Sequence, residues 1–171
     1  MVTDDEFFLA DLDDSASINA ALWKQFSALL GTDRVRGTHL FEGRYENLYV
    51  ERAEIPAIEP VLAAARAQAA RRIGCAPERL SVGFWFNLME PGQVTLPHSH
   101  DDDDELLSGV YYVRVPPHSG ELVLHLPAGR LSIEPRAGRF AFFSPRLLHE
   151  VEKNQGDQSR LSIGMNFGIR A

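Results

Sequence analysis

Three histidines in the C-terminal half have the spacing of a metal site. His98 and His100 are separated by one residue, and residues two apart on a β-strand face the same side, roughly 6.6 Å from each other. His149 follows Ser144 and Pro145, where a second strand is expected to end. Three imidazoles on one side of a metal ion leave open coordination positions, which oxygen chemistry requires. We therefore expect a redox-active metal held by His98, His100 and His149. The other histidines are expected to be ordinary hydrogen-bonded residues: His39, His118 and His125.

Asp102 provides an alternative ligand set. His100 and Asp102 form a His-x-Asp pair, and with His149 they would make the two-histidine, one-carboxylate triad typical of non-haem iron sites. The strand expected to begin before His98 favours the three-histidine set. Asp102 lies in an acidic run, 101–105, which is usually a solvated loop; its functional interpretation is an electrostatic lid that attracts a cationic substrate. The sequence leaves both ligand sets open.

An arginine on the strand expected over 159–167 predicts an acid-binding site. Two faces alternate along this strand: Leu161, Ile163, Met165 and Phe167 on one, and Arg160, Ser162, Gly164 and Asn166 on the other. If the apolar face meets the helices, Arg160 points into the interior and needs a partner carboxylate. A guanidinium holds a carboxylate through two parallel hydrogen bonds, to which Ser162 can add a third. A bound dicarboxylic acid would supply the partner, and an interior Asp or Glu is the alternative. Tyr112 and, more weakly, Asn87 are further candidates for contact with the bound acid.

Two helices and a set of short strands must position these residues. Helical spacing of apolar residues predicts helices over 15–30, with Ser15 as N-cap and Gly31 as stop, and over 57–73, ended by Gly74. One or two strands are expected over 38–50. From residue 80 onward, runs rich in Val, Phe, Tyr and Ile alternate with turns, which is typical of an antiparallel sandwich or barrel. We expect one mainly β, α+β domain over 1–171, with a helical cover and added strands in 1–79 and the β core in 80–171.

The composition excludes several classes of function. The chain has 171 residues, 44% of them hydrophobic, enough for one core. A net charge of −7 argues against nucleic acid as a partner. The single cysteine, the acidic N-terminus and the lack of an apolar run of about 20 residues indicate no disulfide, signal peptide or membrane span, so we expect a cytoplasmic protein. The oligomeric state stays open, with a homodimer as one alternative.

Several motifs resemble a bacterial and phage family of 2-oxoglutarate/Fe(II)-dependent oxygenases. The resemblance covers about 83–167 and rests on the order of the segments Met89–Gly92, Pro97–His100, Leu107–Tyr112 and Arg160–Phe167. It implies a double-stranded β-helix, or jelly roll, with helices packed on the major sheet. It also implies iron near the first histidine pair and His149. Arg160 would bind the distal carboxylate of 2-oxoglutarate, with Ser162 and Tyr112 as helpers. Many relatives carry His-x-Asp where this chain has a second histidine, which leaves the carboxylate ligand open.

The function expected from these features is an oxygenase that converts 2-oxoglutarate to succinate and hydroxylates a small molecule, an amino acid or a peptide side chain. The alternative is a cupin-type metalloprotein, a dioxygenase or isomerase that does not use 2-oxoglutarate, since Gly92, the histidine pair and Glu105 resemble the first cupin motif. A third possibility is a non-catalytic barrel. An inward Arg160 with Ser162 favours the oxygenase. The segment 36–47, with Arg44, Tyr45 and Asn47, is expected to form part of the substrate site.

Overall fold

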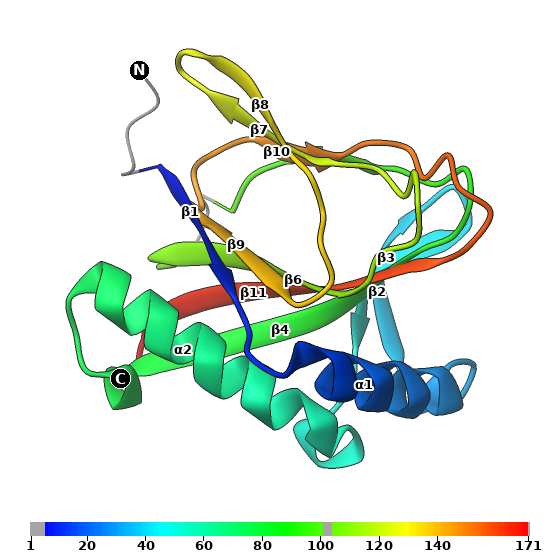
Figure 1. Cartoon of the computed structure of the whole chain (residues 1–171), viewed down its shortest axis with the longest axis horizontal. Helices are drawn as coiled ribbons and strands as arrows, with labels where there is room; N and C mark the ends of the chain where they lie inside the picture. The colour runs from blue at the N-terminus through cyan, green and yellow to red at the C-terminus, as the bar shows by residue number, and fades with distance from the viewer. Residues whose placement is uncertain (1–5, 101–103, 171) are drawn as a thin grey trace.

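Two antiparallel β-sheets face each other, and two helices cover the outer side of the larger one (Figure 1). The computed structural model describes residues 6–100 and 104–170. The major sheet has seven strands in the order β1-β9-β6-β11-β4-β3-β2 and the minor sheet four in the order β5-β10-β7-β8. The strands of the major sheet are β1 (Phe7–Asp11), β2 (Arg36–Phe41), β3 (Arg44–Tyr49), β4 (Leu80–Met89), β6 (Leu107–Arg114), β9 (Arg139–Phe143) and β11 (Arg160–Ile169). Those of the minor sheet are β5 (Thr95–His98), β7 (Leu122–Leu126), β8 (Gly129–Ile133) and β10 (His149–Val151).

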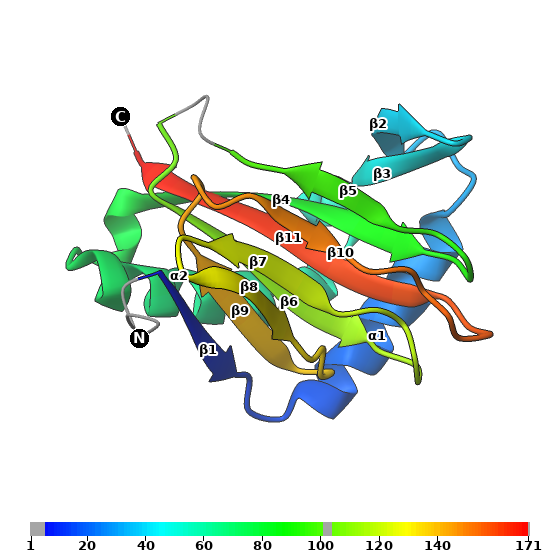
Figure 2. The ribbon, with the colours of Figure 1, turned by 90° about the horizontal axis from the view of Figure 1, so that it is seen from above.

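The arrangement is the double-stranded β-helix that the family resemblance implies. Viewed from above, β5, β10 and β7 of the minor sheet lie over β4, β11 and β6 of the major sheet (Figure 2). Strand β11 is central to the major sheet because it pairs with β4 on one side and β6 on the other. A register shift between Leu161 and Ser162 interrupts its pairing with β6.

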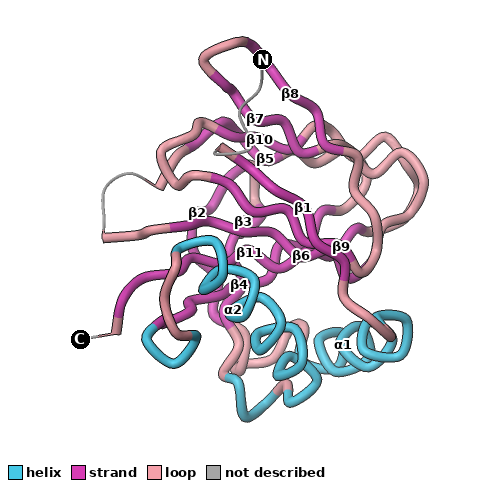
Figure 3. The backbone as a smooth tube through the Cα atoms, turned by 60° about the vertical axis from the view of Figure 1, so that its left-hand side comes forward, coloured by secondary structure: helices cyan, strands magenta, loops and turns pink. Residues whose placement is uncertain are grey.

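The helices α1 (Ser15–Leu29) and α2 (Glu59–Ile73) lie on one side of the strands (Figure 3). Between them and the major sheet lies the main core, to which the helices contribute Leu22, Phe26, Val61, Leu62 and Ala65 and the sheet Phe86, Tyr111, Phe142, Leu161, Ile163, Met165 and Phe167. The apolar face of β11 therefore meets the helices, as predicted. No described helix is both long enough and apolar enough to cross a membrane.

The helix boundaries differ slightly from the prediction. Asp14, in the left-handed region at φ 53°, is the N-cap of α1, so Ser15 is the first helical residue and not the cap. The second helix begins at Glu59 because a short 3₁₀ turn, η2 (Pro56–Ile58), precedes it. Gly74, at φ 81°, ends α2 as predicted, since glycine adopts this conformation without steric cost. Two other short 3₁₀ turns are η1 (Arg52–Glu54) and η3 (Pro77–Arg79).

The N-terminal strand β1 was not predicted. It pairs with β9 from Phe7↔Phe143 to Asp11↔Arg139 and forms one edge of the major sheet. Its five residues lack the alternation of polar and apolar side chains that marks a half-buried strand. The strands expected within 38–50 are the hairpin β2–β3, which extends the major sheet at the opposite edge.

Candidate active site

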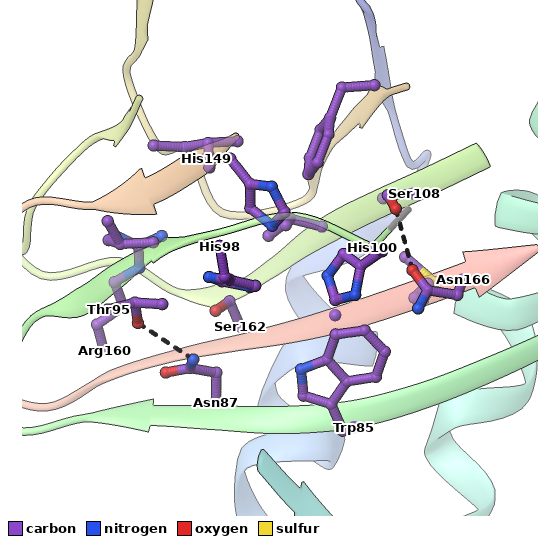
Figure 4. A pocket seen from close by; sticks show the side chains of 17 residues that line it. Trp85, Asn87, Thr95, His98, His100, Ser108, His149, Arg160, Ser162 and Asn166 are labelled. Carbon is purple, nitrogen blue, oxygen red and sulfur yellow. Dashed lines mark hydrogen bonds between the residues drawn. The ribbon is translucent and has the colours of Figure 1, made fainter. Parts of the chain in front are cut away.

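The two sheets bring the three predicted histidines together. His98 ends β5 and His149 begins β10, and the two are directly paired in the antiparallel register. Nitrogen atoms of His98, His100 and His149 lie within 4.8 Å of one another. The ring centroids are 4.2 Å apart for His98 and His149, and 5.2 Å for each of the other two pairs (Figure 4). Within the described residues this is the one group of three or more side chains with the geometry of a metal site.

His100 reaches the cluster by a different route from the one predicted. Strand β5 ends at His98, so His100 does not lie in strand geometry. Its backbone N–H donates to the carbonyl of Pro145 at 2.8 Å, which holds the chain beside the segment that follows β9. The prediction of a same-face pair on one strand was therefore wrong, although both side chains converge. The alternative ligand, Asp102, lies outside the described residues.

Backbone contacts fix the orientation of two of the rings. The Nδ1 atom of His98 lies 2.8 Å from the carbonyl of Leu96, and Nδ1 of His149 lies 2.9 Å from the carbonyl of Leu147. A carbonyl only accepts, so each Nδ1 carries the proton and each Nε2 keeps a lone pair for a metal. Burial, reinforced by the neighbouring His98, lowers the pKa of His149 to about 3 and that of His100 to about 4. Both rings are thus neutral at pH 7, the form that binds metals.

Arg160 is buried without an anionic partner among the described residues. Its side chain is 1% exposed, and Nη1 donates to the carbonyls of Gly120 at 2.6 Å and Ser119 at 3.3 Å. Its guanidinium lies over the ring of Tyr112, 5.1 Å from the centroid. The Nε atom has no hydrogen-bond partner, and no described Asp or Glu forms an ion pair with Arg160. The internal salt bridge considered as an alternative is therefore not found in this part of the chain.

Other polar groups near Arg160 also lack partners. The Tyr112 hydroxyl and the Ser119 hydroxyl are buried, and neither makes a hydrogen bond of acceptable geometry. Burial raises the pKa of Tyr112 although the nearby Arg160 charge opposes the shift. Buried polar groups in proteins are nearly always paired, so the unpaired Nε of Arg160 has capacity for an acceptor oxygen of a bound anion. The sequence pattern does not indicate Ser119, because its proximity to Arg160 depends on the loop before β7.

One cavity joins the arginine to the histidines. His98, His100, His149, Arg160, Ser162 and Asn87 all line it, and Figure 4 shows their side chains between the two sheets. Asn87 on β4 is paired with Ser162 on β11, and its Nδ2 lies 3.4 Å from Thr95 Oγ1. The structure therefore brings the predicted metal ligands together with Arg160, Ser162 and Asn87. Tyr112 contacts the guanidinium and does not line the cavity.

Arg44 supports this cavity from behind, which corrects the prediction that it faces the substrate. Its side chain is buried, and its guanidinium has three acceptors: the carbonyls of Leu88 at 3.0 Å and Val94 at 2.8 Å, and Oδ1 of Asn87 at 2.5 Å. Desolvation lowers the pKa of Arg44, and the charge of Arg160 adds to the effect, which Glu46 opposes. Arg44 therefore orients Asn87 and adds positive charge near Arg160.

A wider groove of about 440 Å3 opens on the histidines from outside, and we call it the outer groove. It is lined by His39, Glu46, Asn47, Tyr49, Trp85, Asn87, Thr95, Leu96, Pro97, His98, Ser99, His100, Glu105 and Asn166. Part of the segment 36–47 does border the site, as predicted, through Asn47. Tyr45, which was also named, is 47% exposed and not in the lining.

His39 is a hydrogen-bonded histidine, as expected. It lines the outer groove, and its backbone is in the left-handed region at φ 58°, which is uncommon for a residue other than glycine. Its Nδ1 lies 2.9 Å from Thr38 Oγ1 and 3.3 Å from Asn47 Nδ2. His125 is also hydrogen-bonded as expected, to Glu150 at 3.2 Å.

Comparisons with known proteins agree with this geometry. Residues 84–168 match the family model described as the 2OG-Fe(II) oxygenase superfamily. No curated protein sequence matches the chain. Among solved structures, a prolyl-4-hydroxylase from Pseudomonas putida is similar at a TM-score of 0.77 and 22% identity, covering 97% of this chain and 94% of that one. The alpha-ketoglutarate-dependent carbocyclase SnoK from nogalamycin biosynthesis has a TM-score of 0.77 and 18% identity, covering 96% and 80%.

A third similar structure is a prolyl hydroxylase from Trichoplax adhaerens in complex with a peptide of hypoxia inducible factor, with a TM-score of 0.73 and 14% identity, covering 96% of this chain and 84% of that one. At these identities the structures establish the fold, and the matched family model carries the assignment. The chain belongs to the 2OG-Fe(II) oxygenase superfamily, and it is a non-haem iron enzyme that uses 2-oxoglutarate.

Proposed function

We propose that this enzyme hydroxylates an aliphatic carbon of a small molecule, an amino acid or a peptide side chain. The balanced reaction consumes the substrate C–H, O₂ and 2-oxoglutarate and yields the alcohol, succinate and CO₂, with one oxygen atom in the alcohol and one in succinate. The observation that carries the proposal is the buried Arg160, which has no anionic partner among the described residues and shares a cavity with the three histidines. The similar structures include hydroxylases of proline and a small-molecule carbocyclase, which supports both substrate types.

In this proposal His98, His100 and His149 hold Fe(II) through nitrogen lone pairs, and Asp102 remains the alternative ligand. The Nδ1 contacts with backbone carbonyls keep the rings of His98 and His149 in one orientation before the metal arrives. Iron supplies the activation of oxygen when bound. The cluster leaves metal positions open for other ligands, since it contributes three nitrogen donors.

Arg160 and its neighbours bind the distal carboxylate of 2-oxoglutarate. The Nε of Arg160, which has no hydrogen-bond partner, is a donor for a carboxylate oxygen, and Tyr112 positions the guanidinium by lying against it. Ser162, in the same cavity, adds a second donor. Asn87, held by Arg44, directs its amide toward the side of the cavity near Thr95. Because these groups are buried, water competes weakly for them and the charged hydrogen bonds are strong.

The test is optical. Purified protein loaded with Fe(II) in the absence of oxygen is titrated with 2-oxoglutarate, and we expect a weak visible metal-to-ligand charge-transfer band that saturates. Admission of oxygen should then release succinate. A protein that binds iron but shows neither the band nor a rise in melting temperature with 2-oxoglutarate would overturn the proposed cosubstrate site.

A further inference from the structure

The outer groove extends along β4 with a carboxylate near each end. Leu48 of β3 is paired with Phe86 of β4, so by the same antiparallel register Glu46 is level with Leu88. Glu105 accepts a hydrogen bond from Asn166 at 2.6 Å, and Asn166 is paired with Gly83. The five residue-to-residue steps from 88 to 83 correspond to roughly 16 Å of strand. Between these ends the ring of Trp85 lies 5.7 Å from that of His100 (Figure 4).

The charge of the outer groove has one sign. Glu46 and Glu105 line it, whereas no Lys or Arg is found among its described lining residues. The histidine in the lining outside the metal cluster is His39, whose Nδ1 lies 3.3 Å from the Asn47 amide nitrogen. A groove lined by two carboxylates, with no Lys or Arg among its described lining residues, favours a positively charged ligand.

One carboxylate oxygen of Glu46, Oε1, receives no hydrogen bond. The Glu46 side chain is 16% exposed, and Oε1 itself is fully buried. The closest cation is Arg44, with Nη1 3.7 Å from that oxygen, too long for a hydrogen bond. Arg44 cannot move closer without cost, because Nε, Nη1 and Nη2 already donate to other acceptors. Glu46 also lines the outer groove and is 16% exposed, so its carboxylate can accept an N–H donor of a ligand from that side.

The middle of the outer groove suits a hydrocarbon chain. Tyr49 and Trp85 line it with ring centroids 6.5 Å apart. The guanidinium of Arg36 lies over the Tyr49 ring, 5.0 Å from its centroid. Trp85 is held against β11, where a Cβ on Gly164 would lie 2.4 Å from the indole. A chain packed on Trp85 would thus pass beside His100.

We propose that the substrate is a basic amino acid side chain, an aliphatic stem that ends in a protonated amine or guanidinium, with its charged end on Glu46. This inference rests on the proposed function, because it takes the histidines as the oxidising centre. A free basic amino acid has two cationic groups for the two carboxylates, whereas the same residue in a peptide has one. The stem on Trp85 would present its methylene groups to the metal.

Binding and turnover test the proposal together. The Fe(II)- and 2-oxoglutarate-loaded protein is titrated with L-lysine, L-arginine, the amide of Nα-acetyl-lysine, and norleucine as the control with an uncharged side chain, and binding is followed by calorimetry without oxygen. We expect at least one cationic compound to bind at least about tenfold more tightly than norleucine, since a hydrogen bond to a charged group contributes this much or more. The same compound should raise succinate release. Tighter binding of the free amino acid would indicate a free basic amino acid as substrate, and tighter binding of the amide would indicate a basic residue in a peptide.

Glu46→Gln should weaken binding of the cationic compound about tenfold or more, whereas Glu134→Gln, the same change at an exposed position outside the groove, should not. Glu105→Gln provides a second variant if Glu46→Gln does not fold. Equal binding of norleucine, no binding of any cationic compound, or unchanged affinity in the glutamine variants would overturn the substrate class while the charge-transfer band remained. Loss of the band in the wild-type protein would instead refute the proposed function.

Discussion

Replacing Arg160 with methionine separates a ligand-binding guanidinium from a structural one. Methionine keeps an unbranched apolar side chain, shorter than that of arginine, and removes the charge and the donors. In the wild-type protein Nη1 bonds two backbone carbonyls while Nε has no partner. The substitution thus acts on two different quantities, the free energy of unfolding without ligand and the affinity for 2-oxoglutarate.

The free energy of unfolding without ligand should change little. Losing hydrogen bonds from a charged donor to Gly120 and Ser119 costs about 1.5–3 kcal/mol each. Removing a buried cation that has no described counter-ion recovers several kcal/mol of desolvation free energy. These contributions oppose each other, so the net change should stay within about 2 kcal/mol. For a protein of this size that corresponds to at most about 8 °C in melting temperature.

The affinity for 2-oxoglutarate should change greatly. Two charge-assisted hydrogen bonds to a carboxylate contribute about 3–6 kcal/mol, so the affinity for 2-oxoglutarate should fall by at least about a hundredfold. Wild-type protein at a 2-oxoglutarate concentration of 100 times Kd gains about 2.7 kcal/mol. This gain corresponds to roughly 5–11 °C in melting temperature. The Arg160→Met variant should show almost none of it at the same concentration.

Thermal denaturation with and without 2-oxoglutarate, on protein loaded with Fe(II) in the absence of oxygen, measures both quantities. Arg136→Met is the matched control, since Arg136 is exposed and outside the cavity. Iron content should remain as in the wild-type protein. A variant that melts far below the wild type without ligand, or one that keeps the full shift with 2-oxoglutarate, would refute the assignment of Arg160 as the carboxylate-binding residue.

Three further substitutions test the surroundings. His149→Ala should reduce iron affinity by more than about a hundredfold, measured by metal analysis after dialysis; Asp102→Ala tested in parallel should retain iron, and loss of iron there would favour the alternative ligand set. Gly164→Ala places a Cβ 2.4 Å from the Trp85 ring, so denaturant unfolding should show a loss of about 1–3 kcal/mol with a changed indole spectrum; an unchanged spectrum would contradict this packing. Asn154→Ala removes hydrogen bonds to the carbonyls of Met89 at 3.0 Å and Gln158 at 2.9 Å. The free energy of unfolding should therefore fall by about 2–4 kcal/mol. A fall below about 1 kcal/mol would argue against these loop contacts.

Local periodicity was sufficient to predict one side of the site. The strict alternation along 160–167 determines which residues of β11 face the helices and which face the cavity, because neighbouring side chains on a strand point to opposite sides. Arg160 and Ser162 could therefore be placed before their neighbours were known. The helices were predictable for the same reason, since their apolar stripes follow helical spacing.

Other parts of the site depend on pairings that sequence spacing does not encode. His100 joins the cluster through a backbone bond to Pro145, 45 residues away along the chain by numbering. His39 lines the outer groove because the β2–β3 hairpin attaches to β4 at the far edge of the major sheet. Arg44 faces inward because it finds three acceptors on β4 and the following loop. None of these partners lies near the residue in sequence, so a local pattern could not predict them.

The distribution of charge across β4 explains how two ligands of opposite sign would be kept apart. The chain carries a net charge of −7, which on its own repels a dianion such as 2-oxoglutarate. Inside the cavity this repulsion is reversed by two buried guanidinium groups, Arg160 and Arg44, close enough that the charge of one lowers the pKa of the other. Outside it, Glu46 shields Arg44 from the outer groove. An anion would therefore be favoured on the Arg160 side of the histidines and a cation on the Glu46 side, so that each ligand is disfavoured in the other's place.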